Sequence, residues 1–242
     1  MAAALGSEPA TAETLDAMIA RRETFLTDYQ DAAYAARYRA AVDRVSAVEA
    51  PLGTRALSEA VARSLFKLMA YKDEYEVARL HMETGFLERL RQEFEGVSEG
   101  GVQRDFKVNY HLAPPLLQLG KDARGRPRKR RFGQWVQMPF RLLAGMKRLR
   151  GTPFDPFGYT AERRRERELI HWYEGILSEL VAGLDRTRLP EAVSIASLPM
   201  DIRGYGPVKD EAIIKVQAEA ARRVASFSRL RENVPVASAT GG

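Results

Sequence analysis

The stretch Leu149–Ile170 reads LRGTPFDPFGYTAERRRERELI and passes from an aromatic turn, rich in proline and glycine, directly into a highly charged segment. Its prolines and glycines are typical of a turn, and Thr160 is a good N-cap for a following helix. Apolar residues then recur at helical spacing, at Leu169, Ile170, Tyr173, Ile176, Leu177, Leu180 and Leu184. The stretch therefore predicts two helices joined by a firmly fixed turn, which either packs as a structural plug or holds a partner.

The same helical spacing predicts several more helices on both sides of this stretch, over about 11–49, 58–81, 135–149, 189–198 and from Pro207 onward. The segment Tyr71–Glu76, YKDEYE, places four charges in the middle of the second of these helices. Either this segment is an exposed strip with a Lys72–Glu76 pair, or it is a polar patch at a pocket or interface.

One segment has the alternation of a β-strand instead. In DFKVNYHL, residues 105–112, apolar and polar side chains alternate before Pro114 and Pro115, and a second short strand is expected at Arg131–Phe132. The predicted fold is mostly α: a multi-helix domain with one small β-hairpin or ribbon around residues 105–133. We expect a single helical domain over residues 11–230, with flexible ends at 1–10 and 231–242.

The composition of the chain excludes several classes of function. The chain has 242 residues, of which 45% are hydrophobic and 29% charged, with a net charge of +6 and no cysteine. Without cysteine the chain has no disulfide, no thiolate nucleophile and no thiolate ligand for an iron–sulfur cluster. We see neither a long apolar run nor a secretion signal, so we expect a cytoplasmic protein. The positive charge favours acidic partners of some kind.

No motif indicates catalysis. The sequence has no glycine-rich phosphate loop, no nucleophile elbow and no H-E-x-x-H helix. Glu168–His171 is its one E-x-x-H pair, whereas carboxylate-bridged metal sites in helical bundles need two. The sequence therefore predicts no catalytic residue and no metal site.

Two candidate binding features lie in and beside the predicted ribbon. A basic loop is either a solvated hairpin tip or a contact for an anion or acidic protein; its cations are Lys121, Arg124, Arg126, Arg128, Lys129, Arg130 and Arg131. Aromatic residues are not interleaved with these cations, so the loop is a weak candidate for nucleic-acid binding. His111 is either hydrogen-bonded at a strand edge or directed at a ligand.

A third candidate is the loop DIRGYGPVK, Asp201–Lys209. Its Arg203 has two interpretations that remain open at this point. The guanidinium binds a carboxylate or phosphate of a partner, or it fastens its own loop to Asp201 or Asp155. The loop ends in Lys209, a second cation beside the paired glycines.

Five motifs in this order resemble the C-terminal region of bacterial indolepyruvate ferredoxin oxidoreductases: LFKLMAYKDEYEVARL, FKVNYHLAPPLL, FGQW, RGTPFDPFGYTAERRRERELI and LPMDIRGYGPVK. The resemblance runs from about Leu15 to Phe227. In that family the complete enzyme oxidatively decarboxylates aryl pyruvates to aryl-acyl-CoA, with thiamine diphosphate, CoA, iron–sulfur clusters and ferredoxin. The resemblance implies that this chain belongs to such a system, as a separate subunit or as one domain of a longer polypeptide.

The resemblance implies no catalytic residue and no cofactor in this chain; thiamine diphosphate, the clusters and CoA belong to partner domains. We expect Asp155 to hydrogen-bond its own turn, while Phe154, Phe157 and Tyr159 bury against neighbouring helices. Around this turn we expect a cationic face that docks the catalytic domains, a CoA phosphate or ferredoxin; its cations are Arg150, Arg163, Arg164, Arg203 and Lys209.

Two other function classes stay open at this point. The alternative is a stand-alone basic helical module that binds nucleic acid or another anionic partner, supported by the basic loop and a pI of about 9.6. A stand-alone enzyme is third, because no acid–base or nucleophile constellation is visible in the sequence.

Overall fold

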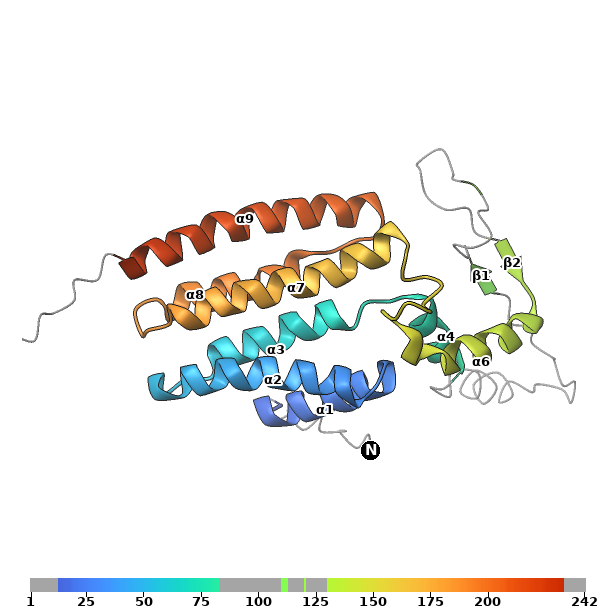
Figure 1. Ribbon diagram of the computed structural model, residues 1–242, viewed down its shortest axis with the longest axis horizontal. Coiled ribbons are helices and arrows are strands. Elements are labelled where there is room, and N and C mark those ends of the chain that lie inside the picture. The colour runs from blue at the N-terminus through green and yellow to red at the C-terminus, as the bar shows by residue number, and fades with distance from the viewer. Residues whose placement is uncertain (1–12, 83–109, 113–119, 121–129, 233–242) are drawn as a thin grey trace, which may run out of the picture. The chain divides into compact units, whose positions relative to one another are not determined.

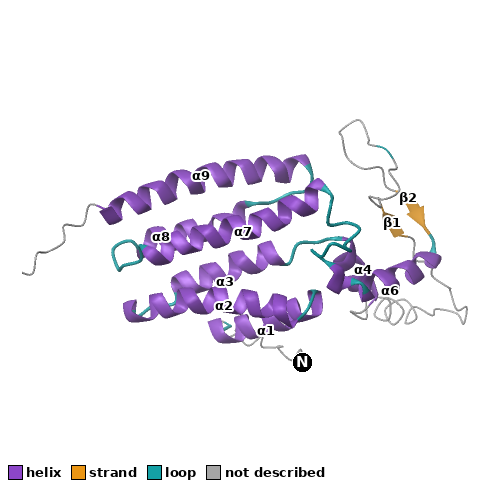
Figure 2. Cartoon of the chain, in the orientation of Figure 1, coloured by secondary structure: helices purple, strands orange, loops and turns teal. Residues whose placement is uncertain are grey.

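The computed structural model describes residues 13–82, 110–112, 120 and 130–232. Within these ranges the fold is mostly α-helical, as the sequence predicts, and it includes a two-stranded antiparallel pair (Figure 2). The sequence indicated one helical domain over 11–230; the chain divides into two compact units. Unit 1 comprises 1–69, 170–201 and 216–242, and unit 2 comprises 70–169 and 202–215.

Unit 1 is a helical assembly whose elements are α1 (Leu15–Tyr29), α2 (Ala32–Glu49), η1 (Ala50–Leu52), α3 (Ala56–Met69), the second half of α7 (Ala161–Ala182), α8 (Leu189–Ser197), η5 (Leu198–Asp201) and most of α9 (Pro207–Glu232). Helix α2 packs against α1 and α3, and α3 packs against α8 (Figure 1). Helices α7 and α9 contribute residues to both units.

Two fully buried tyrosines in the core of unit 1 donate their hydroxyls to backbone carbonyl oxygens. Tyr38 donates to Ala62 O at 3.2 Å, and Tyr173 donates to Ala196 O at 2.7 Å. A buried tyrosine thus contributes its apolar ring to the core without leaving a polar group unpaired.

The long helix expected over 11–49 is two helices, because Asp31 begins a new one. Helix α1 ends at Tyr29, and the Asp31 carboxylate accepts from the backbone N–H of Tyr34 at 2.8 Å as the N-cap of α2. An aspartate in this position satisfies an N–H that has no partner inside the helix, which favours a helix start over continuation.

The fully buried carboxylate of Glu49 accepts three hydrogen bonds from the start of α3. It accepts from the backbone N–H groups of Leu57 and Ser58, each at 2.8 Å, and from the Ser58 hydroxyl at 2.6 Å. These donors lie in the first turn of α3, where the helix dipole favours a negative charge. Glu49 therefore closes the connection between α2 and α3.

Unit 2 contains α4 (Glu74–Met82), β1 (Tyr110–Leu112), β2 (Arg130–Phe132), η3 (Gln134–Val136), α6 (Gln137–Gly145), η4 (Lys147–Leu149) and the first parts of α7 and α9. The two strands pair antiparallel, with His111 opposite Arg131, which confirms a ribbon in this region. Helix α6 packs against α4, and a small core forms between them from Ala78, Val136, Phe140 and Ala144.

The single helix expected over 58–81 is likewise interrupted. Helix α3 ends at Met69, and α4 begins at Glu74 after Asp73 accepts from the backbone N–H of Glu76 at 2.8 Å. The segment Tyr71–Glu76 is therefore a helix start and not an exposed helical strip. Glu76 is buried and bonds Arg79, at 2.9 and 3.0 Å, so the expectation of an exposed Lys72–Glu76 pair was wrong.

Candidate functional site

The turn between Gly151 and Thr160 is held by the carboxylate of Asp155. Its Oδ2 accepts from the backbone N–H of Gly151 at 2.9 Å, and its Oδ1 accepts from that of Phe157 at 3.1 Å. The hydroxyl of Tyr75 in α4 also donates to Oδ1, at 2.9 Å. Asp155 is buried, and its expected bond to its own turn is confirmed. The turn is thereby fixed both to itself and to α4.

Glycine is required at one point of this turn. A Cβ added at Gly158 would lie 2.7 Å from Asp155 Oδ2, closer than a side-chain carbon approaches an oxygen. Any other residue there would displace the carboxylate that organises the turn. The glycine that follows Phe157 is thus explained by packing.

A buried ion pair joins the same turn to the start of α4. Arg150 donates from Nε to Asp73 Oδ2 at 2.5 Å and from Nη2 to Asp73 Oδ1 at 2.8 Å. Arg150 is 4% exposed and Asp73 3%. The Arg150 guanidinium also lies over the ring of Tyr75, 5.4 Å from its centroid. Arg150 therefore does not contribute to an exposed cationic face, because its charge is used inside unit 2.

Arg163, in the first turn of α7, is buried and paired with a carboxylate, as Arg150 is. It donates to the carboxylate of Glu74 at 3.2 and 3.4 Å and lies over the ring of Tyr71. Arg163 is buried, so the expectation that it lies on an exposed face was also wrong. Its neighbour Arg164 is exposed. The N-cap predicted at Thr160 is confirmed, since its hydroxyl accepts from the Arg163 N–H at 3.3 Å.

The remaining predicted site residues are distributed as follows. Lys209 is bound to the Glu166 carboxylate at 2.5 Å, whereas Arg203 is exposed. His111 lies in β1, in register with Arg131 in β2, and Arg131 is exposed. The cations between residues 121 and 129 lie outside the described residues. Arg130 is described only as part of strand β2.

The aromatic side chains of the turn do not all bury. Phe157 is buried and meets the ring of Tyr75 edge-on at 5.3 Å. Phe154, however, is 80% exposed and Tyr159 66%, which corrects the expectation that all three pack inward. Tyr159 is nevertheless fixed, because its hydroxyl donates to Pro153 O at 2.7 Å. The turn thus presents two aromatic rings on a rigid backbone.

Exposed apolar side chains concentrate in unit 2. Nine large hydrophobic side chains are exposed among the described residues, and eight of them lie in unit 2: Trp135, Met138, Leu142, Phe154, Tyr159, Tyr205, Val208 and Ile214. The ninth, Met200, lies in unit 1. Single exposed hydrophobics are ordinary, whereas apolar side chains that adjoin on one surface are typical of an interaction site.

Three of these side chains lie on one stripe in and beside α6. Trp135, Met138 and Leu142 follow helical spacing and are exposed, whereas Phe140 and Ala144 bury against α4. Segment 130–150 contains no acidic residue; its cations are Arg130, Arg131, Arg141, Lys147, Arg148 and Arg150. The sequence predicts a helix over about 135–149 but does not show which of its apolar side chains are exposed. We call Trp135, Met138 and Leu142 the α6 stripe.

The described residues contain neither a metal-binding cluster nor a membrane-spanning helix. No group of three histidine, aspartate or glutamate side chains there could hold a metal ion. In the part of the chain that the structure describes, every helix is too short or too polar to cross a membrane.

Comparison with known proteins places the chain in a family. Residues 15–222 match a family of unknown function, DUF6537, and because the match covers most of the chain, the chain belongs to that family. The search of curated proteins gave no match, and the search of solved structures gave none either.

Proposed function

We propose that this chain is a non-catalytic helical component of an indolepyruvate or aryl pyruvate:ferredoxin oxidoreductase. The complete system converts a 2-oxoacid, CoA and oxidised ferredoxin into acyl-CoA, CO2 and reduced ferredoxin. In this proposal the chain supports assembly in the cytoplasm by docking the catalytic subunits or domains. In this proposal thiamine diphosphate, CoA and the iron–sulfur clusters reside in those partners. For the clusters the reason is that this chain has no cysteine to ligate one.

The observation that carries the proposal is the concentration of exposed apolar side chains in unit 2. Leaving a tryptophan and several aliphatic side chains in water forgoes roughly 1.5–3 kcal/mol for each one that a partner could bury. Aromatic residues and methionine are enriched at the centres of protein interfaces. A chain that works as one component of an assembly accounts for such a surface.

Buried polar side chains of unit 2 bond one another, which supports a scaffolding role for this unit. Two of the five motifs on which the family resemblance rests contact each other within unit 2. Asp73 and Tyr75 come from the YKDEYE motif, and Arg150 and Asp155 come from the aromatic turn. Each of these four polar groups has a partner inside unit 2. Their contribution is therefore to hold the turn and its exposed rings in place.

The test is affinity purification of the tagged chain from its native host, with mass spectrometry of the bound proteins. The eluate is assayed for arylpyruvate- and CoA-dependent reduction of ferredoxin. We expect thiamine- and cluster-bearing polypeptides to co-purify with that activity, or the chain itself to be found within such a polypeptide. Recovery of an isolated, inactive chain would contradict the proposal and favour the independent anion-binding module.

A further inference from the structure

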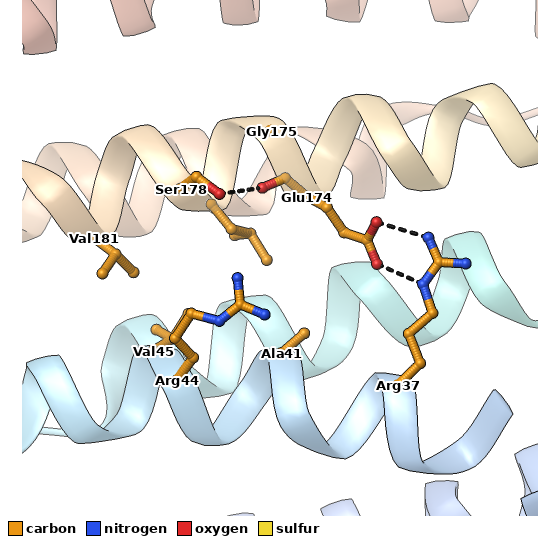
Figure 3. Close-up of a pocket in the computed structure, with 9 residues that line it drawn as sticks. Arg37, Ala41, Arg44, Val45, Glu174, Gly175, Ser178 and Val181 are labelled. Carbon is orange, nitrogen blue, oxygen red and sulfur yellow. Dashed lines mark hydrogen bonds and ion pairs between the residues drawn. The ribbon is translucent and has the colours of Figure 1, made fainter. Parts of the chain in front are cut away.

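A groove of about 410 Å³ lies between α2 and the part of α7 that belongs to unit 1 (Figure 3). Its apolar lining consists of Ala41, Val45, Leu177 and Val181. Small-molecule pockets span about 300–1,000 Å³. An α-helix with its side chains is about 10–12 Å across, too wide for a space of this volume. The groove is thus of a size to take a small molecule and not a partner helix.

Two arginines on α2 face this groove, and only one has an internal partner. Arg37 donates to both carboxylate oxygens of Glu174, at 2.7 and 2.6 Å, so that the charges of this pair offset each other. Arg44 also lines the groove and is exposed, and no described residue forms a hydrogen bond or ion pair with it. Figure 3 shows its guanidinium directed between the two helices.

The α7 wall of the groove contains a glycine that the chain's own packing does not require. Gly175 lies inside α7, and a Cβ built there would meet no atom within 4 Å. Glycine in a helix interior is less stable than alanine, and here no neighbouring atom demands it. Its missing side chain keeps the wall of the groove open. The hydroxyl of Ser178 donates to Glu174 O at 3.0 Å, and Arg44 is the cation of the groove whose charge no carboxylate of the described residues offsets.

We propose that this groove binds a small anion with an apolar tail, a carboxylate or a phosphate monoester. The Arg44 guanidinium holds the head group, since a planar fork of donors matches both kinds of anion. The apolar tail lies over Gly175 and along the half-buried Val181, at the opening above the buried Val45 and Leu177. This inference is independent of the proposed oxidoreductase role, because every residue that carries it lies in unit 1.

The test is isothermal titration calorimetry of the full chain at low salt, with octanoate and octyl phosphate as probes. Acetate and inorganic phosphate provide the same head groups without a tail. We expect saturable binding of at least one octyl probe at one site, with little heat from the short anions. Arg44→Gln should weaken that binding about tenfold or more, because a charge-assisted hydrogen bond is lost.

Arg229→Gln is the matched control for charge. Arg229 is an exposed arginine of unit 1 on α9, outside the groove, and its loss should leave octyl binding unchanged. Gly175→Ala tests the open wall independently of charge. It should raise the Tm by about 1–4 °C through helix propensity while weakening octyl binding several-fold. No saturable binding of either octyl probe, or equal binding by wild type and Arg44→Gln, would overturn the proposal.

Discussion

Arg150 and Asp73 are 77 residues apart in the sequence, yet their side chains form two hydrogen bonds in the interior of unit 2. Asp73 is at the same time the residue on which α4 begins, through its bond to the Glu76 N–H. One carboxylate therefore fixes both the helix start and the aromatic turn after α6. This shared use explains why the sequence has a charged segment at Tyr71–Glu76 and a rigid turn at Gly151–Thr160.

The first prediction concerns that carboxylate. Asp73→Ala leaves the buried Arg150 guanidinium without its counter-charge and should lower the free energy of unfolding by about 3–5 kcal/mol. Urea denaturation followed by circular dichroism measures the change. The control is Asp43→Ala, which breaks an exposed pair with Arg39 and should cost no more than about 1 kcal/mol. Equal effects of the two variants would show that the buried pair has no special structural role.

The second prediction compares two adjacent arginines in the first turns of α7. Arg163→Glu places a negative charge beside Glu74 in a buried site and should destabilise the chain by about 3 kcal/mol or more. Arg164→Glu changes the same charge at an exposed position and should shift stability by about 0.5 kcal/mol or less. Thermal unfolding of both variants measures the difference. Similar losses at the two positions would contradict the placement of Arg163.

The third prediction concerns the hydrogen bond from Tyr75 to Asp155. Tyr75→Phe should cost about 0.5–1.5 kcal/mol, and Asp155→Ala should cost more, because it leaves three donors without their acceptor. If the two groups interact as the distances indicate, the double variant should be less destabilised than the sum of the single ones. A double-mutant cycle by urea denaturation measures this coupling. Strict additivity would argue against a direct bond.

The fourth prediction is a loss of stability at alkaline pH. Burial raises the pKa of Tyr71 from 10.0 to about 12, with the nearby Asp73 charge as a further cause. The folded state therefore keeps the phenol protonated where the unfolded state loses its proton. The resulting stabilisation, about 2–3 kcal/mol, is fully present below pH 10 and is lost as pH rises toward about 12.

The measurement is the free energy of unfolding against pH for wild type and Tyr71→Phe. Between about pH 10 and 12 the wild-type curve should fall more steeply than that of the variant, which lacks the titrating phenol. The tyrosines that remain are the same in both proteins, so the difference between the curves isolates Tyr71. Parallel curves over that interval would contradict the burial of the phenol.

The sequence indicates the helix start at Thr160 but not the helix starts at Asp31 and Asp73. Thr160 was recognised as an N-cap because a run of prolines and glycines precedes it. Asp31 and Asp73 were missed, since each stands inside a continuous helical pattern of apolar residues. An aspartate within such a pattern is compatible with a solvated helix surface as well as with a cap. The choice depends on whether the chain bends there, which tertiary packing decides.

Exposure was the other property that sequence could not settle. The sequence indicates a helix over about 135–149. It does not show that Phe140 and Ala144 are buried while the α6 stripe is exposed, because a helix with apolar residues on two faces gives one continuous pattern. Similarly, nothing in the local sequence distinguished buried Arg163 from exposed Arg164. Only the position of Glu74, 89 residues earlier, makes the difference.

We propose that unit 2 joins this chain to its partners through exposed apolar side chains. The most direct measurement compares wild type with Trp135→Ala/Met138→Ala in affinity purification from the native host. Both side chains are exposed, so the variant should unfold at nearly the same urea concentration as wild type. Met200→Ala, at the exposed large hydrophobic of unit 1, is the matched control.

We expect the double variant to recover at least tenfold less of the thiamine- and cluster-bearing partners, because interface anchors of this kind contribute about 2 kcal/mol or more. Arylpyruvate-dependent reduction of ferredoxin by the eluate should fall in proportion. The Met200→Ala control should recover as much as wild type. Full recovery by the double variant, with its fold intact, would contradict the claim that exposed apolar side chains of unit 2 join the chain to its partners.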